Sequence, residues 1–219
     1  MTVRDHAVRY SRGEEIANTL SHGVGALLAV GGLVVLCVLA ALRGNAWHIV
    51  GCGVFGAALV LLYTTSALYH GTRHLRAKAA LRVLDHSAIF ILIAGTYTPF
   101  ALVNLRGPWG WSLLGVIWGL AVLGIVLQMG VLGRGTAASV LLYVGMGWVV
   151  LIAINPLLDA VAPGGLTLLL IGGLAYTAGT VFYVWRRLPY HHAVWHGFVL
   201  TGSASHFFAI LFYVIPTAA

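Results

Sequence analysis

Residues 192–215 read HAVWHGFVLTGSASHFFAILFYVI, an apolar run long enough to cross a lipid bilayer as one helix. The run opens on His192 and His196, which are four residues apart and therefore lie one turn apart on the same face of a helix. Two imidazoles at that spacing can bind one metal ion together. The stretch therefore predicts a transmembrane helix that carries part of a metal site.

The rest of the chain has the same apolar character. Of its 219 residues, 60% are hydrophobic and only 8% are charged, which excludes an ordinary soluble domain. Turn and helix-stop signals separate seven apolar runs. We predict an all-α, polytopic membrane protein: a single seven-helix transmembrane bundle over residues 1–219, with residues 1–15 as a cytoplasmic arm. The predicted spans are 16–42, 47–70, 82–105, 111–131, 136–155, 165–186 and 192–215.

The positions of the basic residues predict the orientation of the bundle. All of the 12 Lys and Arg residues except Arg43 and Arg106 fall in the N-terminal arm or in loops on the same side as the arm. The positive-inside rule places that side in the cytoplasm, so the C-terminus lies outside, as seven spans require. The formal net charge of +7 is thus a topology signal, and we expect no nucleic-acid partner.

Further chemistry-bearing residues are predicted at the same membrane depth. Ser66 and His70 are four residues apart at the end of the second span, and Asp85 opens the third span on the same side. The predicted topology brings them to the cytoplasmic half of the bilayer, level with His192 and His196. Three imidazoles suit Zn2+ and leave one position for a water molecule, whose pKa zinc lowers to about 7. We therefore predict His70, His192 and His196 as zinc ligands.

Asp85 is the predicted proton carrier. The helix of His192 lacks the glutamate base of a His-Glu-x-x-His motif, so another carboxylate has to serve. Asp85 alone combines membrane depth with the cytoplasmic side. Ser66 is placed to hydrogen-bond the water or a developing oxyanion. The other acids lie in the arm or near the far surface: Asp5, Glu14, Glu15 and Asp159.

Each of these residues also has a simpler interpretation. His192 and His196 can be interfacial histidines that bond to carbonyls or headgroups, and His70 can cap a helix. Asp85 can be a first-turn acid that the helix dipole stabilises, or a partner of Arg82. Ser66 can be a small residue at a helix contact. Their common depth favours the metal site, because ionisable residues in spans are costly and are often functional.

Three other histidines rank lower as site residues. His22 lies in the first span, also in its cytoplasmic half. His86 directly follows Asp85 and should point elsewhere on the helix. His206 lies about 20 Å further along the last helix than His192, where we expect it to hydrogen-bond a neighbouring helix.

The motifs taken together are more specific than any one of them. They are Ser66-Ala67-Leu68-Tyr69-His70, Asp85-His86-Ser87, Gly95-Thr96-Tyr97-Thr98-Pro99 and His192-Ala193-Val194-Trp195-His196, with Glu14-Glu15-Ile16-Ala17-Asn18 and Ser21-His22-Gly23 at the front. In this combination the chain resembles the hemolysin III family, the bacterial branch of the progestin and adipoQ receptor (PAQR) superfamily. The resemblance implies seven spans, a cytoplasmic N-terminus and an intramembrane zinc. It maps the ligands onto His70, His192 and His196, with Asp85 and Ser66 nearby.

These observations predict a zinc-dependent hydrolase of a lipid amide or ester, similar to a ceramidase, in the inner (plasma) membrane. A membrane lipid is the expected substrate or ligand. The alternative is a membrane-homeostasis, sensor or receptor-like protein in which zinc is structural and joins the second and seventh helices. A cytolysin is disfavoured, because the sequence shows neither a secretion signal nor a charged lumen.

Overall fold

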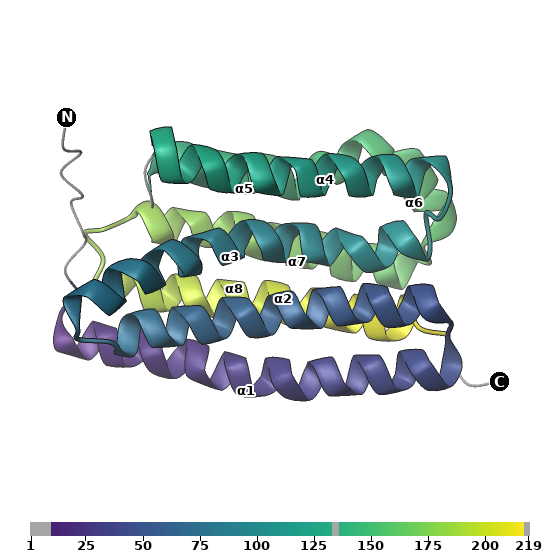
Figure 1. The fold of residues 1–219 in the computed structure, drawn as a ribbon. Helices are drawn as coiled ribbons and strands as arrows, with labels where there is room; N and C mark the ends of the chain where they lie inside the picture. The colour runs from purple at the N-terminus through teal and green to yellow at the C-terminus, as the bar shows by residue number, and fades with distance from the viewer. Residues whose placement is uncertain (1–9, 133–135, 217–219) are drawn as a thin grey trace.

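The structure, a computed structural model, describes residues 10–132 and 136–216. Within them, seven helices are long and apolar enough to cross a membrane and no β-strand occurs, which confirms the predicted all-α, multi-pass fold. Figure 1 shows the helices side by side in one bundle. In chain order the elements are α1 (Arg12–Arg43), α2 (Ala46–Gly71), α3 (Leu75–Leu102), α4 (Pro108–Leu127), the π-helical turn η1 (Gln128–Leu132), α5 (Ala137–Gly147), the 3-10 segment η2 (Val149–Ala153), α6 (Ile154–Ala160), α7 (Pro163–Val184) and α8 (His191–Tyr213).

Helices that follow one another along the chain pack against one another. The largest contacts join α1 to α2, α2 to α3, α3 to α4 and α7 to α8. In addition, α1 packs against α8, so the first and last spans are neighbours. That contact brings residues from the two ends of the chain together (Figure 1).

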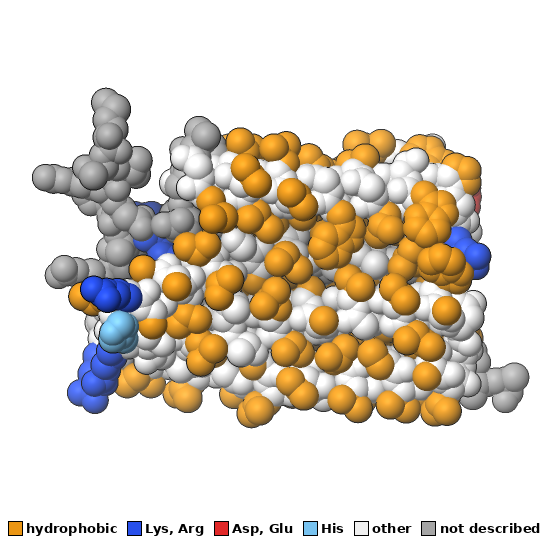
Figure 2. All heavy atoms as spheres, in the orientation of Figure 1, with side chains coloured by type: hydrophobic (Ala, Val, Ile, Leu, Met, Phe, Trp, Pro, Cys, Tyr) orange, Lys and Arg blue, Asp and Glu red, His pale blue; other side chains and the backbone are white. Residues whose placement is uncertain are grey.

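The outer surface is apolar, as expected for a protein in lipid. Figure 2 shows hydrophobic side chains over the length of the bundle, with Lys and Arg gathered at its two ends. Leu27 and Leu28 of α1, for example, are 77% and 68% exposed. In water such exposure would be costly, but lipid tails are as apolar as leucine. We call the end at which α1, α3 and α8 begin the basic end.

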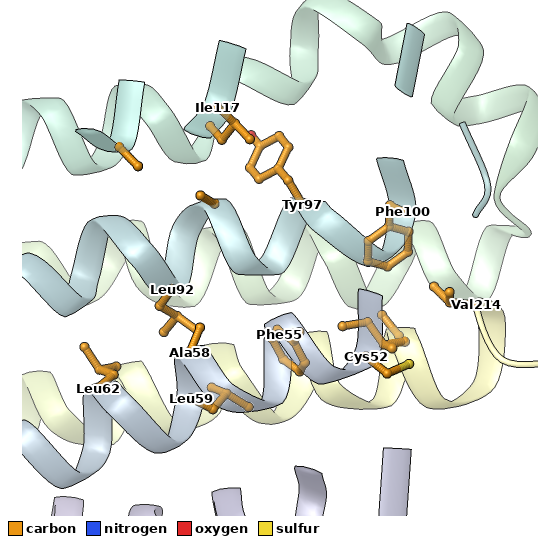
Figure 3. Close-up of a cluster of buried hydrophobic side chains, with 14 of the residues drawn as sticks. Cys52, Phe55, Ala58, Leu59, Leu62, Leu92, Tyr97, Phe100, Ile117 and Val214 are labelled. Carbon is orange, nitrogen blue, oxygen red and sulfur yellow. The ribbon is translucent and has the colours of Figure 1, made fainter. Parts of the chain in front are cut away.

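The interior packs α2 closely against α3. Figure 3 shows the buried hydrophobic cluster at this contact, which includes Phe55 and Leu62 of α2 and Leu92 of α3. At Gly51 a Cβ atom would lie 2.8 Å from the Cα of Pro99, so only glycine allows the two backbones to approach so closely. The helix α3 continues through Pro99 to Leu102. These contacts hold the two helices that carry His70 and Asp85.

The helices α1 and α3 begin at least four residues earlier than hydropathy predicts. α1 begins at Arg12, inside the stretch predicted as an arm, with a capping box between Ser11 and Glu14. α3 begins at Leu75 rather than at residue 82, and the His74 side chain accepts a hydrogen bond from the backbone of its first turn. Hydropathy marks the part of a helix that lies in lipid, whereas backbone hydrogen bonds continue into the charged turns. Glu14 and Glu15 are therefore helical.

Candidate metal centre

Three buried histidines meet at the basic end of the bundle. His70 lies in the last turn of α2, and His192 and His196 lie in the first two turns of α8. One ring nitrogen from each histidine can be chosen so that all three atoms lie within 4.8 Å of one another. The ring centroids are 5.0 Å apart for His70 and His192, and 4.6 Å apart for His192 and His196. The structure thus brings together the three residues that the sequence singled out as ligands.

A carboxylate orients the first histidine. Oε2 of Glu15 lies 2.7 Å from Nδ1 of His70, and Oε1 of Glu15 accepts from Nζ of Lys78 at 2.9 Å. Because an ionised carboxylate only accepts hydrogen bonds, Nδ1 of His70 carries the hydrogen and Nε2 keeps the lone pair. Sequence reasoning assigned Glu15 to the arm and missed this contact. Glu15 lies in the first turn of α1, four residues after the capping residue Ser11, and this position is the feature that could have assigned it to the helix.

A hydroxyl group orients the third histidine. Ser21 Oγ donates to the backbone oxygen of Asn18 at 3.0 Å, so it has only its acceptor site left for Nδ1 of His196, 2.9 Å away. That bond fixes the hydrogen of His196 on Nδ1 and leaves the lone pair on Nε2. Outer partners of this kind are typical of metal-binding histidines. Both outer partners come from α1: Glu15 contacts His70 of α2, and Ser21 contacts His196 of α8.

The start of α8 is held in place from α1 and from the segment before it. Tyr190 precedes α8 with a left-handed backbone (φ 56°), and its N–H donates to Oε1 of Glu14 at 3.1 Å. The ring of Tyr10 lies over the centre, 5.1 Å from the ring of His192 and 5.6 Å from that of His70, centroid to centroid. Burial raises the pKa of the Tyr10 phenol, so it stays protonated at neutral pH. The Tyr10 ring thus covers the site at the basic end.

The donor set fits a metal ion that prefers nitrogen ligands. Nε2 of His70 and Nδ1 of His192 are buried and have no hydrogen-bond partner within the described parts of the chain. Buried polar atoms are normally paired, so these two nitrogens call for a partner of another kind. Tetrahedral zinc with Zn–N distances of 2.0–2.1 Å places its ligand nitrogens about 3.3 Å apart. The three nitrogens, which lie within 4.8 Å of one another, would have to approach one another to bind zinc in this way.

Asp85 lies on the wall of a cavity that also contains His192. The cavity is bounded mainly by α3, α5, α7 and α8, with His22 contributed by α1 and Leu62 by α2. Along α3 it extends from Asp85 to Tyr97, which is about 18 Å of helix. Oδ2 of Asp85 lies 3.3 Å from Nδ1 of His86. The cavity is thus polar where Asp85 and the histidines meet, and mostly apolar along its length.

Ser66 is buried one turn before His70 on α2, with 2% of its surface exposed. It is absent from the described lining of the cavity.

His206 behaves as the sequence predicted, since its Nε2 lies 3.2 Å from the backbone oxygen of Leu169 on α7. Its ring also lines the cavity, at the end away from His192.

Two histidines that the sequence ranked low take part in the site. His86 lines the cavity beside Asp85 instead of pointing elsewhere, and α5 contacts it through the Tyr143 hydroxyl, which donates to its backbone oxygen at 3.2 Å. Its Nε2 lies 3.4 Å from the Tyr183 hydroxyl. His22 of α1 stacks on His196, with ring centroids 3.4 Å apart. The contact between α1 and α8 that creates this stack has no local signal in the sequence.

Comparisons with known proteins agree over nearly the whole chain. A family described as Haemolysin-III related matches residues 10–207. Hemolysin-3 of Bacillus cereus is 48% identical over 206 residues, covering 94% of each chain, and the Hemolysin-3 homolog of Bacillus subtilis (strain 168) is 47% identical over 202 residues, covering 92% of this chain and 95% of the relative. The human Monocyte to macrophage differentiation factor is 28% identical over 207 residues, covering 92% of this chain and 84% of its own. The family match confirms the resemblance drawn from the motifs.

Proposed function

This chain belongs to the haemolysin-III-related family of multi-pass membrane proteins, and from that membership and its histidine centre we propose that it is a metal-dependent hydrolase of lipid amides or esters. The metal we propose is zinc, the location is the inner (plasma) membrane, and the substrate is a membrane lipid. One observation carries this proposal. His192 belongs both to the histidine centre and to the wall of a long apolar cavity that Asp85 also lines.

The cavity suits an acyl chain. Its walls between the polar end and His206 are mostly aliphatic and aromatic, with Ile89, Leu92 and Trp148 among them. Ligand sites are commonly apolar clefts with a few polar groups that fix orientation. An acyl chain lying along α3 would bring its carbonyl group to Asp85 and His192.

The residues at the polar end have separate roles in the proposed hydrolysis: metal binding, proton transfer and hydrogen bonding. Zinc held by three imidazoles supplies a Lewis acid for the carbonyl group and makes water nucleophilic near neutral pH. Asp85 takes a proton from the attacking water as the new C–O bond forms. It returns that proton to the leaving nitrogen or oxygen as the acyl bond breaks. Ser66 lies one turn from His70 and outside the cavity lining, so its proposed role is to donate a hydrogen bond to the attacking water.

The orientation follows from the basic residues. Lys78 and the Arg residues of the first turns lie at the same end as the histidines, and the positive-inside rule places that end in the cytoplasm. Substrate would thus be hydrolysed in the cytoplasmic half of the bilayer.

A substrate screen tests the proposal. Purified protein in detergent is incubated with a panel of N-acyl and O-acyl lipids, as isolated, after chelation, and after zinc is added back. We expect release of free fatty acid from at least one lipid, its loss on chelation, and its return with zinc. No release from any lipid by zinc-loaded, folded protein would contradict the proposal.

A structural metal is the second candidate. Its ligands come from α2 and α8, so a bound ion would join helices that are distant in the chain, as a structural site does. In that case the protein would serve as a sensor or in membrane homeostasis. A melting curve with and without chelator, run beside the screen, separates the candidates: a structural metal changes the melting temperature while no lipid turns over.

Glu15 should support metal binding through His70. Replacing it (Glu15→Gln) removes the charge that holds the hydrogen of His70 on Nδ1. Loss of such an outer partner typically lowers metal affinity by about 10–100-fold. The zinc dissociation constant, measured by competition with a chelator, checks this. Glu14→Gln is the matched control, because Glu14 bonds to Ser11 and Tyr190 instead of a ligand. Equal affinities in the two variants would contradict the role of Glu15.

A further inference from the structure

His22 is a buried imidazole without a protein partner. Only 3% of its surface is exposed, and neither ring nitrogen has a hydrogen-bond partner within residues 10–132 and 136–216. The His22 ring is stacked on the His196 ring, with an interplanar angle of 10°. It is nearly perpendicular to the Tyr63 ring, with an interplanar angle of 84°. Since buried polar atoms are normally paired, the two nitrogens indicate a bound molecule that is not protein.

The stack excludes His22 as a further ligand of the same ion. A metal lies in the plane of the imidazole that binds it, along the nitrogen lone pair. The planes of His22 and His196 are nearly parallel and their centroids are 3.4 Å apart. An ion in the plane of His196 would therefore lie well off the plane of His22, whereas coordination requires about 2.0–2.1 Å within that plane. The ion would therefore leave both nitrogens of His22 without a partner.

The cavity is where that partner would lie. His22 lines it together with Asp85 and His192, at the polar end. A neutral imidazole offers one N–H donor and one acceptor. Resting on the proposed function, we propose that His22 is a further substrate-binding residue, which donates a hydrogen bond to the carbonyl oxygen of an acyl lipid.

The surroundings of His22 hold its ring in one orientation. His196 covers one face, and the Tyr63 ring stands perpendicular to it, with its own hydroxyl donating to Ser203 Oγ at 2.7 Å. A donor fixed in this way needs no reorganisation when charge develops on the carbonyl oxygen. Fixed donors of this kind contribute most in sites that exclude water.

Two variants test the proposal. His22→Phe keeps an aromatic ring against His196 but removes the donor, and His22→Gln keeps an N–H donor. The probe is dodecanamide, a single-chain acyl amide, bound to the zinc-loaded protein in detergent. For His22→Phe we expect an unchanged zinc dissociation constant, about tenfold weaker dodecanamide binding, and a fall in kcat/KM of about 10²–10³-fold on the lipid found by the screen. His22→Gln should recover part of both losses.

The matched control is His48→Gln. His48 is a buried histidine at the start of α2, whereas His70 lies at the end of that helix. Its side chain forms a capping box with Asn45, and glutamine is an ordinary residue at that capping position. This variant should bind zinc and dodecanamide as the wild type does.

The outcomes separate this inference from the proposed function. If His22→Phe and His22→Gln both lose zinc as His196→Ala should, His22 supports the metal and the inference fails. It also fails if His22→Phe binds dodecanamide as tightly as wild type. If no lipid is hydrolysed but dodecanamide binding still weakens in His22→Phe, the hydrolase proposal fails and the assignment of His22 stands.

Discussion

Replacing His196 with alanine should abolish both zinc binding and lipid hydrolysis. His196 is 1% exposed, belongs to the triad, and has its Nδ1 hydrogen-bonded to Ser21, which leaves Nε2 for a metal. Because losing an outer partner of a ligand already lowers affinity by 10–100-fold, loss of the ligand itself should lower it by more than about 100-fold. Zinc content after dialysis and fatty-acid release from the screened lipid measure the two effects.

The control for this variant is His206→Ala on the same helix. His206 bonds to the Leu169 carbonyl on α7 and is not part of the triad, so zinc content should stay at the wild-type value. Hydrolysis that persists in zinc-free His196→Ala protein would defeat the metal-dependent mechanism. Equal zinc content in wild type and His196→Ala would contradict the assignment of these histidines as a zinc site.

Replacing Asp85 with asparagine should abolish hydrolysis while zinc stays bound. Asp85 lines the cavity, is 8% exposed and is not one of the three histidines of the triad, so the ligand set is expected to remain intact. A general acid–base residue typically contributes about 10²–10⁴-fold to the rate, so kcat should fall by that factor. Measuring kcat beside zinc content separates the two roles.

Asp159→Asn is the matched control for Asp85→Asn. Asp159 is exposed in α6, away from the basic end, and its variant should retain wild-type kcat and zinc content. A wild-type rate in Asp85→Asn would show that another group carries the proton. If neither the wild type nor any variant hydrolyses lipid, while chelation lowers the melting temperature of the wild type but not that of His196→Ala, the structural role of the metal is favoured.

Much of the fold could be predicted from hydropathy, because lipid leaves few choices to a polypeptide. Backbone groups in the bilayer must bond within their own segment, so an apolar run such as residues 192–215 has to be a helix. The structure has helices at all seven predicted runs. Helix ends were predicted less well, because α1 and α3 continue beyond the apolar part into charged turns that hydropathy excludes.

The candidate ligands could be predicted because their signal is local. The spacing of His192 and His196 places two imidazoles on one helix face, and the basic residues place His70 at the same end of the bundle. Their outer partners could not be predicted in the same way. Glu15 was assigned to the arm, yet it lies in α1 and contacts His70.

The sequence by itself determined seven spans, the end of the bundle at which each span begins, and three histidines at a common depth. Only the tertiary structure decided that α1 lies against α8, which brings Ser21 and His22 to His196. It also decided that His86 shares a cavity with Asp85. The physical reason is that helical periodicity fixes which residues share a face, whereas the helix opposite that face depends on how all seven pack together.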